Sequence, residues 1–359
     1  KKGINLKVLY RSNISVKKYY DTGFRKKISW NINILKGYKY QFLNFIGPNK
    51  VSSIYPITTN FFKNIIDKDT DIIWVHGIKN WYNLCIIFLG KIFKKKIFVR
   101  DEVTHFSKRR SYLNKLLNLF FYNIIDNFID IYLAIGTENK KYYLDNNIKK
   151  NKIIMMPYVV DNNFFKYKHK TINNKKINFL FAAKLIKKKG ADLLLKSINF
   201  LNKDKKFISS SNFTIVGDGA LSVQLKNYVK KNDLKNINFL PFQNQIELKK
   251  LYLKSDVFIM PSIIEPWGLT VNEAMASGNA IITSDNVGSS FDLVFNNING
   301  YKFKNNNYQD LAKKIYLIYM KKNLIKKFKK NSIKIINNWD FKRCLIGLKK
   351  AIKIIEKKN

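Results

Sequence analysis

Short apolar runs alternate with longer amphipathic stretches along the first half of the chain. Runs at 6–10, 71–75, 96–99 and 131–135 have the length of buried strands, and 113–128 and 138–146 have helical periodicity. Regular alternation of strands with helices is typical of α/β proteins with parallel sheets. The pattern therefore predicts an α/β domain over residues 1–168.

The same alternation starts again after a polar, strand-poor segment near 165–175. Strands are predicted at 178–182, 213–216, 237–240, 257–260 and 280–283, with helices between them. Helical segments alone follow from 308, from 324 and beyond Trp339. We therefore expect a second α/β domain over 169–339 and a terminal helix within 340–359, with both sheets doubly wound and largely parallel.

The stretch 257–278, VFIMPSIIEPWGLTVNEAMASG, combines a strand, a loop and a short helix, and it carries two glutamates. Glu265 lies in the loop and Glu273 lies on the helix. The apolar positions of the helix are spaced for packing on the sheet: Val271, Ala274, Met275 and Gly278. Glu273 lies roughly opposite these positions, so we expect it to face a cleft.

The start of this helix is a candidate anion site. The backbone N–H groups of Gly268, Leu269 and Thr270 find no partner within the helix, and the helix dipole favours negative charge there. Carboxylates beside an anion site suit a ligand that carries both phosphates and hydroxyls. A sugar nucleotide has both, so the pattern points to a sugar-nucleotide site.

Three segments together resemble the retaining glycosyltransferases of family 4, within group 1 of the glycosyl transferases. The stretch 257–278 resembles the paired-glutamate signature of that family. Residues 181–190, FAAKLIKKKG, resemble its F-x-G-R-L-x-x-x-K-G segment, and residues 215–221, IVGDGAL, resemble its V-G-D-G-P-L segment. The resemblance implies the GT-B fold, in which two Rossmann-like domains face each other across a cleft and the last helix crosses back to the first domain.

The resemblance also implies roles for four charged residues. Lys184 and Lys189 would stabilise the departing diphosphate as its negative charge grows. The family has arginine at the place of Lys184. Lysine keeps the positive charge but cannot make the bidentate hydrogen bonds of a guanidinium group. Glu265 would bind hydroxyls of the donor sugar, and Glu273 would bind the ribose.

Two further residues are candidates to line the nucleotide pocket, because both follow predicted strands. The alternative role of Gly217 is structural, in a tight turn, and the alternative role of Phe242 is packing as a buried loop residue. The acidic triplet 69–71, DTD, imitates a metal motif of the other large glycosyltransferase fold, but it precedes a strand instead of following one. We therefore expect no metal and no cofactor besides the nucleoside diphosphate sugar.

The acceptor side of the cleft has four candidates. Many family members carry a histidine directly after the strand at 96–99, but this chain has Arg100 there. Arg100 and Glu102 could bind acceptor or donor oxygens, and His105 could substitute for the missing histidine. His76 ends another strand at the expected cleft. Structural roles stay open for all four.

The formal net charge of +43 is extreme. One interpretation of this charge is an anionic membrane or nucleic acid as a partner. The other is coding bias, because Lys, Asn, Ile, Phe and Tyr recur throughout the chain. No arginine-rich arm is present, so we expect no nucleic-acid partner. Two distant cysteines and the absence of a recognisable signal peptide suggest a cytoplasmic location, with peripheral attachment to the cytoplasmic face of the membrane.

The sequence thus predicts a retaining, metal-independent hexosyltransferase. It would move a sugar from a nucleoside diphosphate sugar to a hydroxyl of a sugar or a lipid-linked acceptor, in the synthesis of surface polysaccharide or glycolipid. The alternatives are a GT-B sugar-nucleotide epimerase or a sucrose-type synthase. A basic nucleic-acid-binding protein is the alternative from another class.

Overall fold

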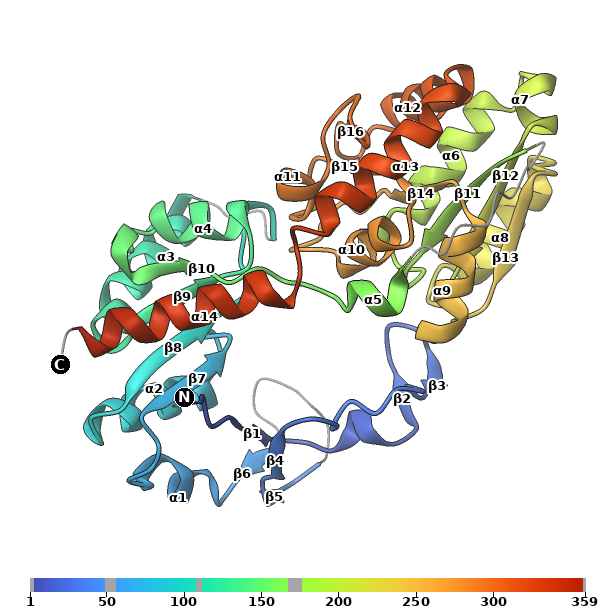
Figure 1. The fold of residues 1–359 in the computed structure, drawn as a ribbon. Helices are drawn as coiled ribbons and strands as arrows, with labels where there is room; N and C mark the ends of the chain where they lie inside the picture. The colour runs from blue at the N-terminus through green and yellow to red at the C-terminus, as the bar shows by residue number, and fades with distance from the viewer. Residues whose placement is uncertain (1–2, 49–55, 108–111, 167–175, 358–359) are drawn as a thin grey trace.

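The computed structural model describes residues 3–48, 56–107, 112–166 and 176–357. Two α/β domains follow one another along the chain, and the last helix returns from the second domain to the first (Figure 1). The boundary that the sequence predicts between residues 168 and 169 lies outside the described residues. Among the described residues, no helix combines the length and the apolar character that crossing a bilayer requires.

The first domain is built on four parallel strands in the order β10–β9–β8–β7. Their bounds are Ile72–His76 for β7, Lys96–Arg100 for β8, Ile131–Ala134 for β9 and Ile153–Met155 for β10. Three helices connect them: α2 (Trp81–Ile92), α3 (Tyr112–Ile125) and α4 (Thr137–Leu144). The short helical turns η2 (His105–Ser107), η3 (Asp126–Phe128) and η4 (Lys150–Lys152) complete the connections.

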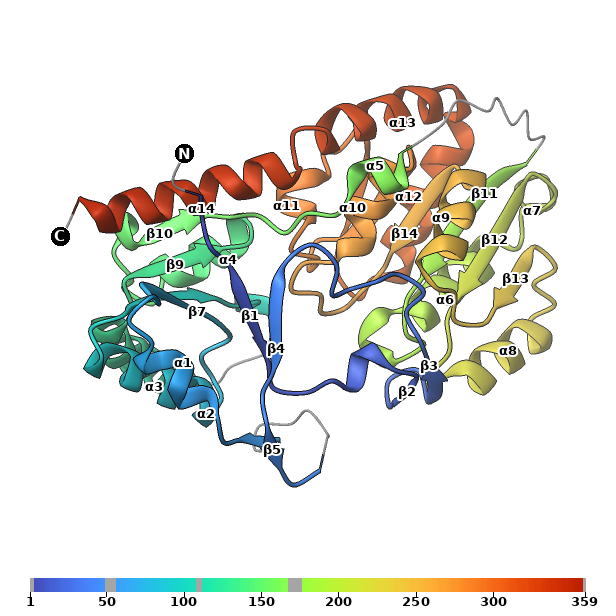
Figure 2. The same cartoon turned by 60° about the horizontal axis from the view of Figure 1, so that its bottom comes forward.

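The two faces of this sheet are covered by different parts of the chain. Val99 points to the side where α2, α3 and α4 pack, whereas Phe98 points to the side of α14 (Phe341–Glu356). The alternation follows from the two-residue period of a strand. Figure 2 shows α14 above the sheet and α2 and α3 below it. The terminal helix therefore completes the core of the first domain.

The described residues between 3 and 58 form small separate sheets. β1 (Lys7–Tyr10) pairs in parallel with β4 (Lys39–Phe42), β2 (Tyr19–Asp21) forms a hairpin with β3 (Lys26–Ile28), and β5 (Phe45–Ile46) pairs with β6 (Ile57–Thr58). The turn η1 (Ile14–Val16) and helix α1 (Phe61–Ile66) complete this region. The β2–β3 hairpin extends to the second domain, near β13 and α9 (Figures 1 and 2).

The second domain has a six-stranded parallel sheet in the order β13–β12–β11–β14–β15–β16. The strands are β11 (Ile177–Ala182), β12 (Ser211–Val216), β13 (Ile237–Leu240), β14 (Val257–Met260), β15 (Ala280–Ser284) and β16 (Gly300–Phe303). Helices α6 (Ala191–Leu201), α8 (Ser222–Lys231) and α12 (Tyr308–Met320) cover one face. Helices α9 (Gln245–Lys254), α10 (Leu269–Ala276) and the end of α13 (Lys322–Ile336) cover the other. The sheet is therefore doubly wound, as predicted.

Two segments connect the domains. After β10 the chain runs through Tyr158 into α5 (Asn162–Phe165), and it returns past Trp339 into α14. The indole N–H of Trp339 donates to the carbonyl of Tyr158 at 2.8 Å, so the outgoing and returning segments are bonded together. The domains also meet where Thr137 donates to Asp292 of α11 (Ser290–Leu293), from its hydroxyl at 2.6 Å and its N–H at 2.9 Å.

Most predicted strands and helices of the second domain lie within two residues of their observed bounds. The sequence pattern missed α2, whose residues WYNLCIIFLGKI have no clear polar face, and also β10, β16 and α7 (Lys205–Ser209). Residues 22–25 form the turn of the β2–β3 hairpin, which the sequence pattern did not predict. Pairing between strands created this hairpin, and the local pattern does not encode such pairing.

Candidate active site

The loops that follow β11, β14 and β15 interlock at the carboxyl end of the second sheet. Ile263 donates its N–H to the carbonyl of Lys188 at 2.9 Å, and Gly288 donates to the carbonyl of Glu265 at 2.9 Å. Gly190 has a φ of +72°, and a Cβ there would lie 2.1 Å from the carbonyl oxygen of Pro261. This close approach requires glycine, and it holds the loop of Lys189 against the loop of Glu265.

Lys189 and Glu265 form an ion pair at this edge. Lys189 belongs to the turn η5 (Lys187–Lys189), and Glu265 lies in the loop between β14 and α10. Their side chains are 19% and 12% exposed, so the pair is largely shielded yet still reaches solvent. The structure therefore brings together a cation and a carboxylate that the sequence separates by 76 residues.

Lys184 makes a different contact. Its ammonium group lies 2.9 Å from each carboxylate oxygen of Asp21, in the β2–β3 hairpin. The same carboxylate accepts the N–H groups of Gly23 and Phe24 at 2.8 and 2.9 Å. Partial burial by itself would raise the pKa of Asp21, but the bonds from Lys184, Phe24 and Gly23 outweigh it and lower the pKa. Lys184 thus links the second domain to the hairpin.

Glu273 bonds to a tyrosine of the neighbouring helix. The hydroxyl of Tyr252 on α9 donates to the Glu273 carboxylate at 2.9 Å. Burial raises the pKa of Glu273 to about 7, although the Tyr252 hydrogen bond opposes the shift. The predicted apolar stripe of α10 is confirmed, because Val271, Ala274 and Met275 are buried in the core.

The N-terminus of α10 leaves its backbone amides without a side-chain cap. Gly268 occupies the N-cap position in the left-handed conformation, with φ of +93°, and no side chain caps the helix. Leu269 and Thr270 form the first turn. The preceding Trp267 is buried, stacks on Trp339 and donates to Asn272, so it is a packing residue.

Phe242 lies beneath the hairpin. Its ring is 4.7 Å from that of Phe24 and 6.1 Å from that of Trp30, between ring centres. Asp218 accepts the N–H of Phe242 at 2.8 Å and pairs with Lys26 of the hairpin at 3.4 Å. The first-domain hairpin therefore covers the part of the second domain where the nucleotide pocket was predicted.

Gly217 follows β12 beside this region. Its φ is +140°, and a Cβ there would lie 2.0 Å from the carbonyl oxygen of Ala183. A larger residue would push the loop after β12 away from the loop after β11. Gly217 therefore brings the loop of Asp218 close to that of Lys184.

The acceptor-side candidates divide into two groups. Arg100 is buried and donates to the carbonyls of Met156 and Pro157 at 2.8 and 2.9 Å, which fixes the segment that leaves the first domain. Glu102 is exposed and accepts the hydroxyl of Tyr158 at 2.7 Å. His105 lies elsewhere, 2.8 Å from Asp145 at the end of α4.

His76 ends β7 in register with Arg100. Its ring stacks on Trp74 at 5.3 Å between ring centres. Burial lowers the pKa of His76, and the nearby Arg100 charge lowers it further, so the imidazole is neutral at pH 7. His76, Arg100 and Glu102 thus share one end of the first sheet.

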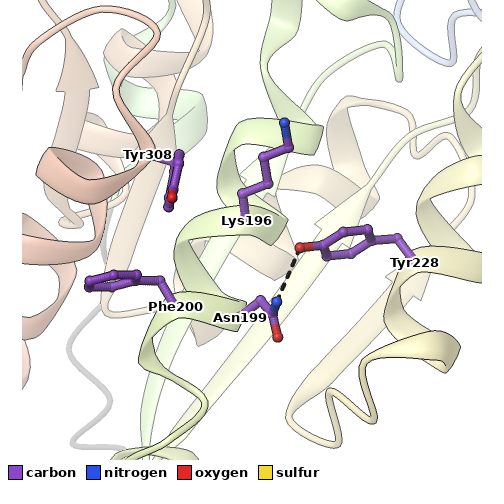
Figure 3. Close-up of a pocket in the computed structure, with 5 residues that line it drawn as sticks. All are labelled: Lys196, Asn199, Phe200, Tyr228 and Tyr308. Carbon is purple, nitrogen blue, oxygen red and sulfur yellow. Dashed lines mark hydrogen bonds between the residues drawn. The ribbon is translucent and has the colours of Figure 1, made fainter.

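A hollow of about 350 Å³ lies on the outer surface of the second domain. Figure 3 shows its lining of Lys196, Asn199 and Phe200 from α6, Tyr228 from α8 and Tyr308 from α12. The amide of Asn199 and the hydroxyl of Tyr228 are 3.3 Å apart. Because these helices cover one face of the sheet, the hollow is separate from the loops that carry the predicted site residues.

Comparison with known proteins identifies the second domain. Residues 162–335 match the family model of the glycosyl transferases group 1. This match places the second domain among the group 1 glycosyl transferases. An uncharacterized glycosyltransferase of Methanocaldococcus jannaschii is 26% identical over 291 residues, which are 80% of this chain and 77% of that protein.

Solved structures share the fold of the whole chain. Anabaena HepE in complex with UDP and glucose has a TM-score of 0.65 at 15% identity, covering 89% of this chain and 85% of its own. Sucrose-phosphate synthase of Thermosynechococcus elongatus has a TM-score of 0.67 at 16% identity, covering 89% and 84%. The likeness confirms the predicted GT-B fold.

The region that matches the family model contains Lys184, Lys189, Glu265 and Glu273, and the acceptor-side candidates lie outside it. The contacts join Lys189 to Glu265 and Lys184 to the hairpin, whereas Glu273 bonds to Tyr252. Sequence reasoning did not assign roles to the partners of Lys184 and Glu273. No sequence signal marks Tyr252 as the partner of Glu273.

Proposed function

We propose that the chain as a whole is a group 1 glycosyl transferase, and that it is a retaining, metal-independent enzyme of family 4. It transfers a hexose from a nucleoside diphosphate sugar to a hydroxyl acceptor. The observation that carries the proposal is the Lys189–Glu265 pair at the carboxyl end of the parallel strands, where open α/β sheets bind ligands. The uncapped N-terminus of α10 follows the same loop and supplies amides for the diphosphate.

The charged groups bind different parts of the donor. Lys189 and Lys184 stabilise the negative charge that grows on the departing diphosphate. Glu265, paired with Lys189, accepts hydrogen bonds from the sugar hydroxyls. Glu273 accepts bonds from the ribose, and Phe242 and Gly217 border the base. Because the two lysines supply the positive charge, the proposal needs no metal ion.

Retention of configuration rests on the resemblance to family 4. The acceptor oxygen attacks the anomeric carbon on the face that the diphosphate leaves. The bond from carbon to the phosphate oxygen breaks, the bond to the acceptor oxygen forms, and the acceptor proton passes to the departing phosphate. Glu265 binds hydroxyls in this scheme and does not attack carbon, so the two-carboxylate chemistry of glycosidases does not apply.

The donor nucleotide is proposed to be UDP, because HepE was solved with UDP and glucose. The acceptor is proposed to be a sugar or a lipid-linked sugar, used in surface polysaccharide or glycolipid synthesis. His76 and Glu102 border the acceptor end, and Arg100 holds the chain beneath them. We also propose a cytoplasmic enzyme that attaches peripherally to an anionic membrane through its first domain.

Sugar transfer is tested with the purified full chain in two steps. Thermal stabilisation by UDP, GDP and ADP identifies the base, because a ligand that binds only the folded state raises the melting temperature. UDP-hexoses are then supplied with simple glycoside acceptors, with and without EDTA, and the anomer of the product is read by NMR. A product of inverted configuration would refute the retaining mechanism. Activity that EDTA abolishes and Mg²⁺ restores would refute metal independence.

A further inference from the structure

Helix α3 presents an apolar arc to solvent. Six apolar side chains, each at least 45% exposed, lie within one broad sector of the helix: Tyr112, Leu113, Leu116, Leu117, Phe120 and Ile124. With about 100° between successive residues, this sector is opposite the buried residues Asn118, Tyr122 and Ile125. The arc therefore takes no part in the core of the first domain.

The buried face of α3 is unusually polar for a helix on a sheet. The Asn118 side chain accepts from Lys79 at 2.6 Å and also bonds to Asn146. Tyr122 packs against Tyr142 and Tyr143 of α4. An ordinary surface helix buries its apolar residues and exposes its polar ones. In α3 much of the apolar surface is instead on the solvent side.

The neighbouring helix α2 continues the apolar surface. Trp81, Phe88 and Ile92 follow the spacing i, i+7, i+11 along one side and are exposed. The Phe88 ring lies 4.5 Å from that of Phe128, in the turn directly after α3. The two helices lie in the same layer, on the side of the sheet away from α14 (Figure 2). An exposed apolar surface of this kind marks a binding face.

Charge identifies the partner. Neither α2 nor α3 contains an acidic residue, and their only charged residues are Lys91 and Lys115. Residues 1–166 carry 30 lysines and arginines against 11 aspartates and glutamates. We propose that the α2–α3 face, defined by Trp81, Phe88 and Ile92 together with the six residues of the α3 arc, docks on an anionic lipid bilayer. An interfacial helix combines apolar insertion with attraction to acidic headgroups.

The placement of the face deepens the proposed function, on which this part of the inference rests. Helices α2 and α3 each begin beyond the carboxyl end of a strand, β7 and β8. Those strand ends also carry His76 and Arg100. Trp81 and Tyr112, at the helix N-termini, therefore lie on the cleft side of the docking face. An acceptor carried by the bilayer would reach the cleft from this side.

The test measures sedimentation of the full chain with vesicles of phosphatidylcholine, with or without about one-quarter phosphatidylglycerol. Wild type is expected to bind the anionic vesicles and to release partly at high salt. The variant Leu113→Glu/Phe120→Glu is expected to bind on the order of tenfold less, because it loses apolar insertion and adds repulsion. Leu113→Ser/Phe120→Ser, which adds no charge, is expected to fall between the two.

The matched control is Val223→Glu/Met320→Glu, which adds the same charge at exposed apolar positions of the second domain. It is expected to bind like wild type, and all variants should keep the wild-type melting temperature and UDP stabilisation. Equal loss in the control would show that only diffuse charge matters and would overturn the docking face. Failure of wild type to bind anionic vesicles would overturn it too, as would an α3-dependent dimer without vesicle binding. Retained UDP binding would leave the proposed transferase function standing.

Discussion

The Lys184–Asp21 contact predicts that the hairpin competes with the donor. If Lys184 binds the diphosphate, it must exchange the Asp21 carboxylate for phosphate oxygens. Asp21→Asn removes the competing charge and keeps a carbonyl oxygen that can still accept the N–H groups of Gly23 and Phe24. The turn of the hairpin should therefore persist, and the variant should bind a nucleoside diphosphate more tightly than wild type.

The size of the effect follows from the exposure of the pair. Lys184 is 35% exposed and Asp21 is 14% exposed, so solvent screens their attraction only in part. Ion pairs that remain in contact with water contribute up to about 1 kcal/mol. The lowered pKa of Asp21 keeps its carboxylate charged at pH 7, so the full charge is lost on mutation. A change of about 1 kcal/mol corresponds to roughly five-fold tighter binding.

Calorimetric titration of UDP into the two proteins measures this change directly. Asp233→Asn is the matched control, because it removes the same charge from the exposed pair with Lys235, away from the cleft. The control should bind UDP like wild type at moderate salt. Equal or weaker binding by Asp21→Asn, with an unchanged control, would refute competition. The hairpin would then hold Lys184 in its binding position.

Three further predictions concern the second domain. Glu265→Gln should lower turnover about 10²-fold, or roughly 2.7 kcal/mol of transition-state stabilisation, and this loss should exceed its effect on donor binding. Lys189→Ala should weaken UDP binding as well. Glu247→Gln on α9, where the side chain is 45% exposed and pairs with Lys250, should change neither turnover nor binding. Burial raises the pKa of Glu273 from 4.5 to about 7, so between these pH values the folded state holds a proton that the unfolded chain has released. As pH rises from 4.5 to 7, Glu273 therefore lowers the free energy of unfolding by up to about 3 kcal/mol. Glu273→Gln should therefore raise the melting temperature relative to wild type more at pH 8 than at pH 5, and an equal difference at both would contradict the assigned shift. Gly190→Ala should lower the free energy of unfolding in urea by more than about 2 kcal/mol, because the added Cβ would meet the Pro261 carbonyl and φ is +72°. If the variant were as stable as wild type, the loop of Lys189 could move away from the loop of Glu265 at no cost.

The fold of the second domain could be predicted from the sequence because its strands are local. Runs such as Val257–Met260 are buried on both faces of a parallel sheet, so they are apolar at every position. The amphipathic helices between them carry the 3.6-residue period. The loop glutamate, the helix glutamate and the lysine segment could also be found, because each lies in a short stretch with its own pattern.

Other features depended on contacts between distant residues. Lys184 meets Asp21 across 163 positions, and Glu273 meets Tyr252 through the packing of two helices. Arg100 could equally have been a binding residue in the sequence, but the structure uses its guanidinium to hold the carbonyls of the interdomain segment. A side chain's partner depends on where the backbone brings it, and local periodicity contains no information about that.

The α2–α3 face shows the same division between sequence and tertiary structure. The apolar residues of both helices are evident in the sequence, and there they are indistinguishable from core residues. Only the packing shows that Asn118 and Tyr122 face inward while Leu113 and Phe120 face solvent. The sequence by itself determined two α/β domains and the charged residues that lie along one loop edge, since short-range patterns specify strands, helices and turns. Tertiary structure decided which charges pair and which apolar surface stays open, because burial is a property of the assembled fold.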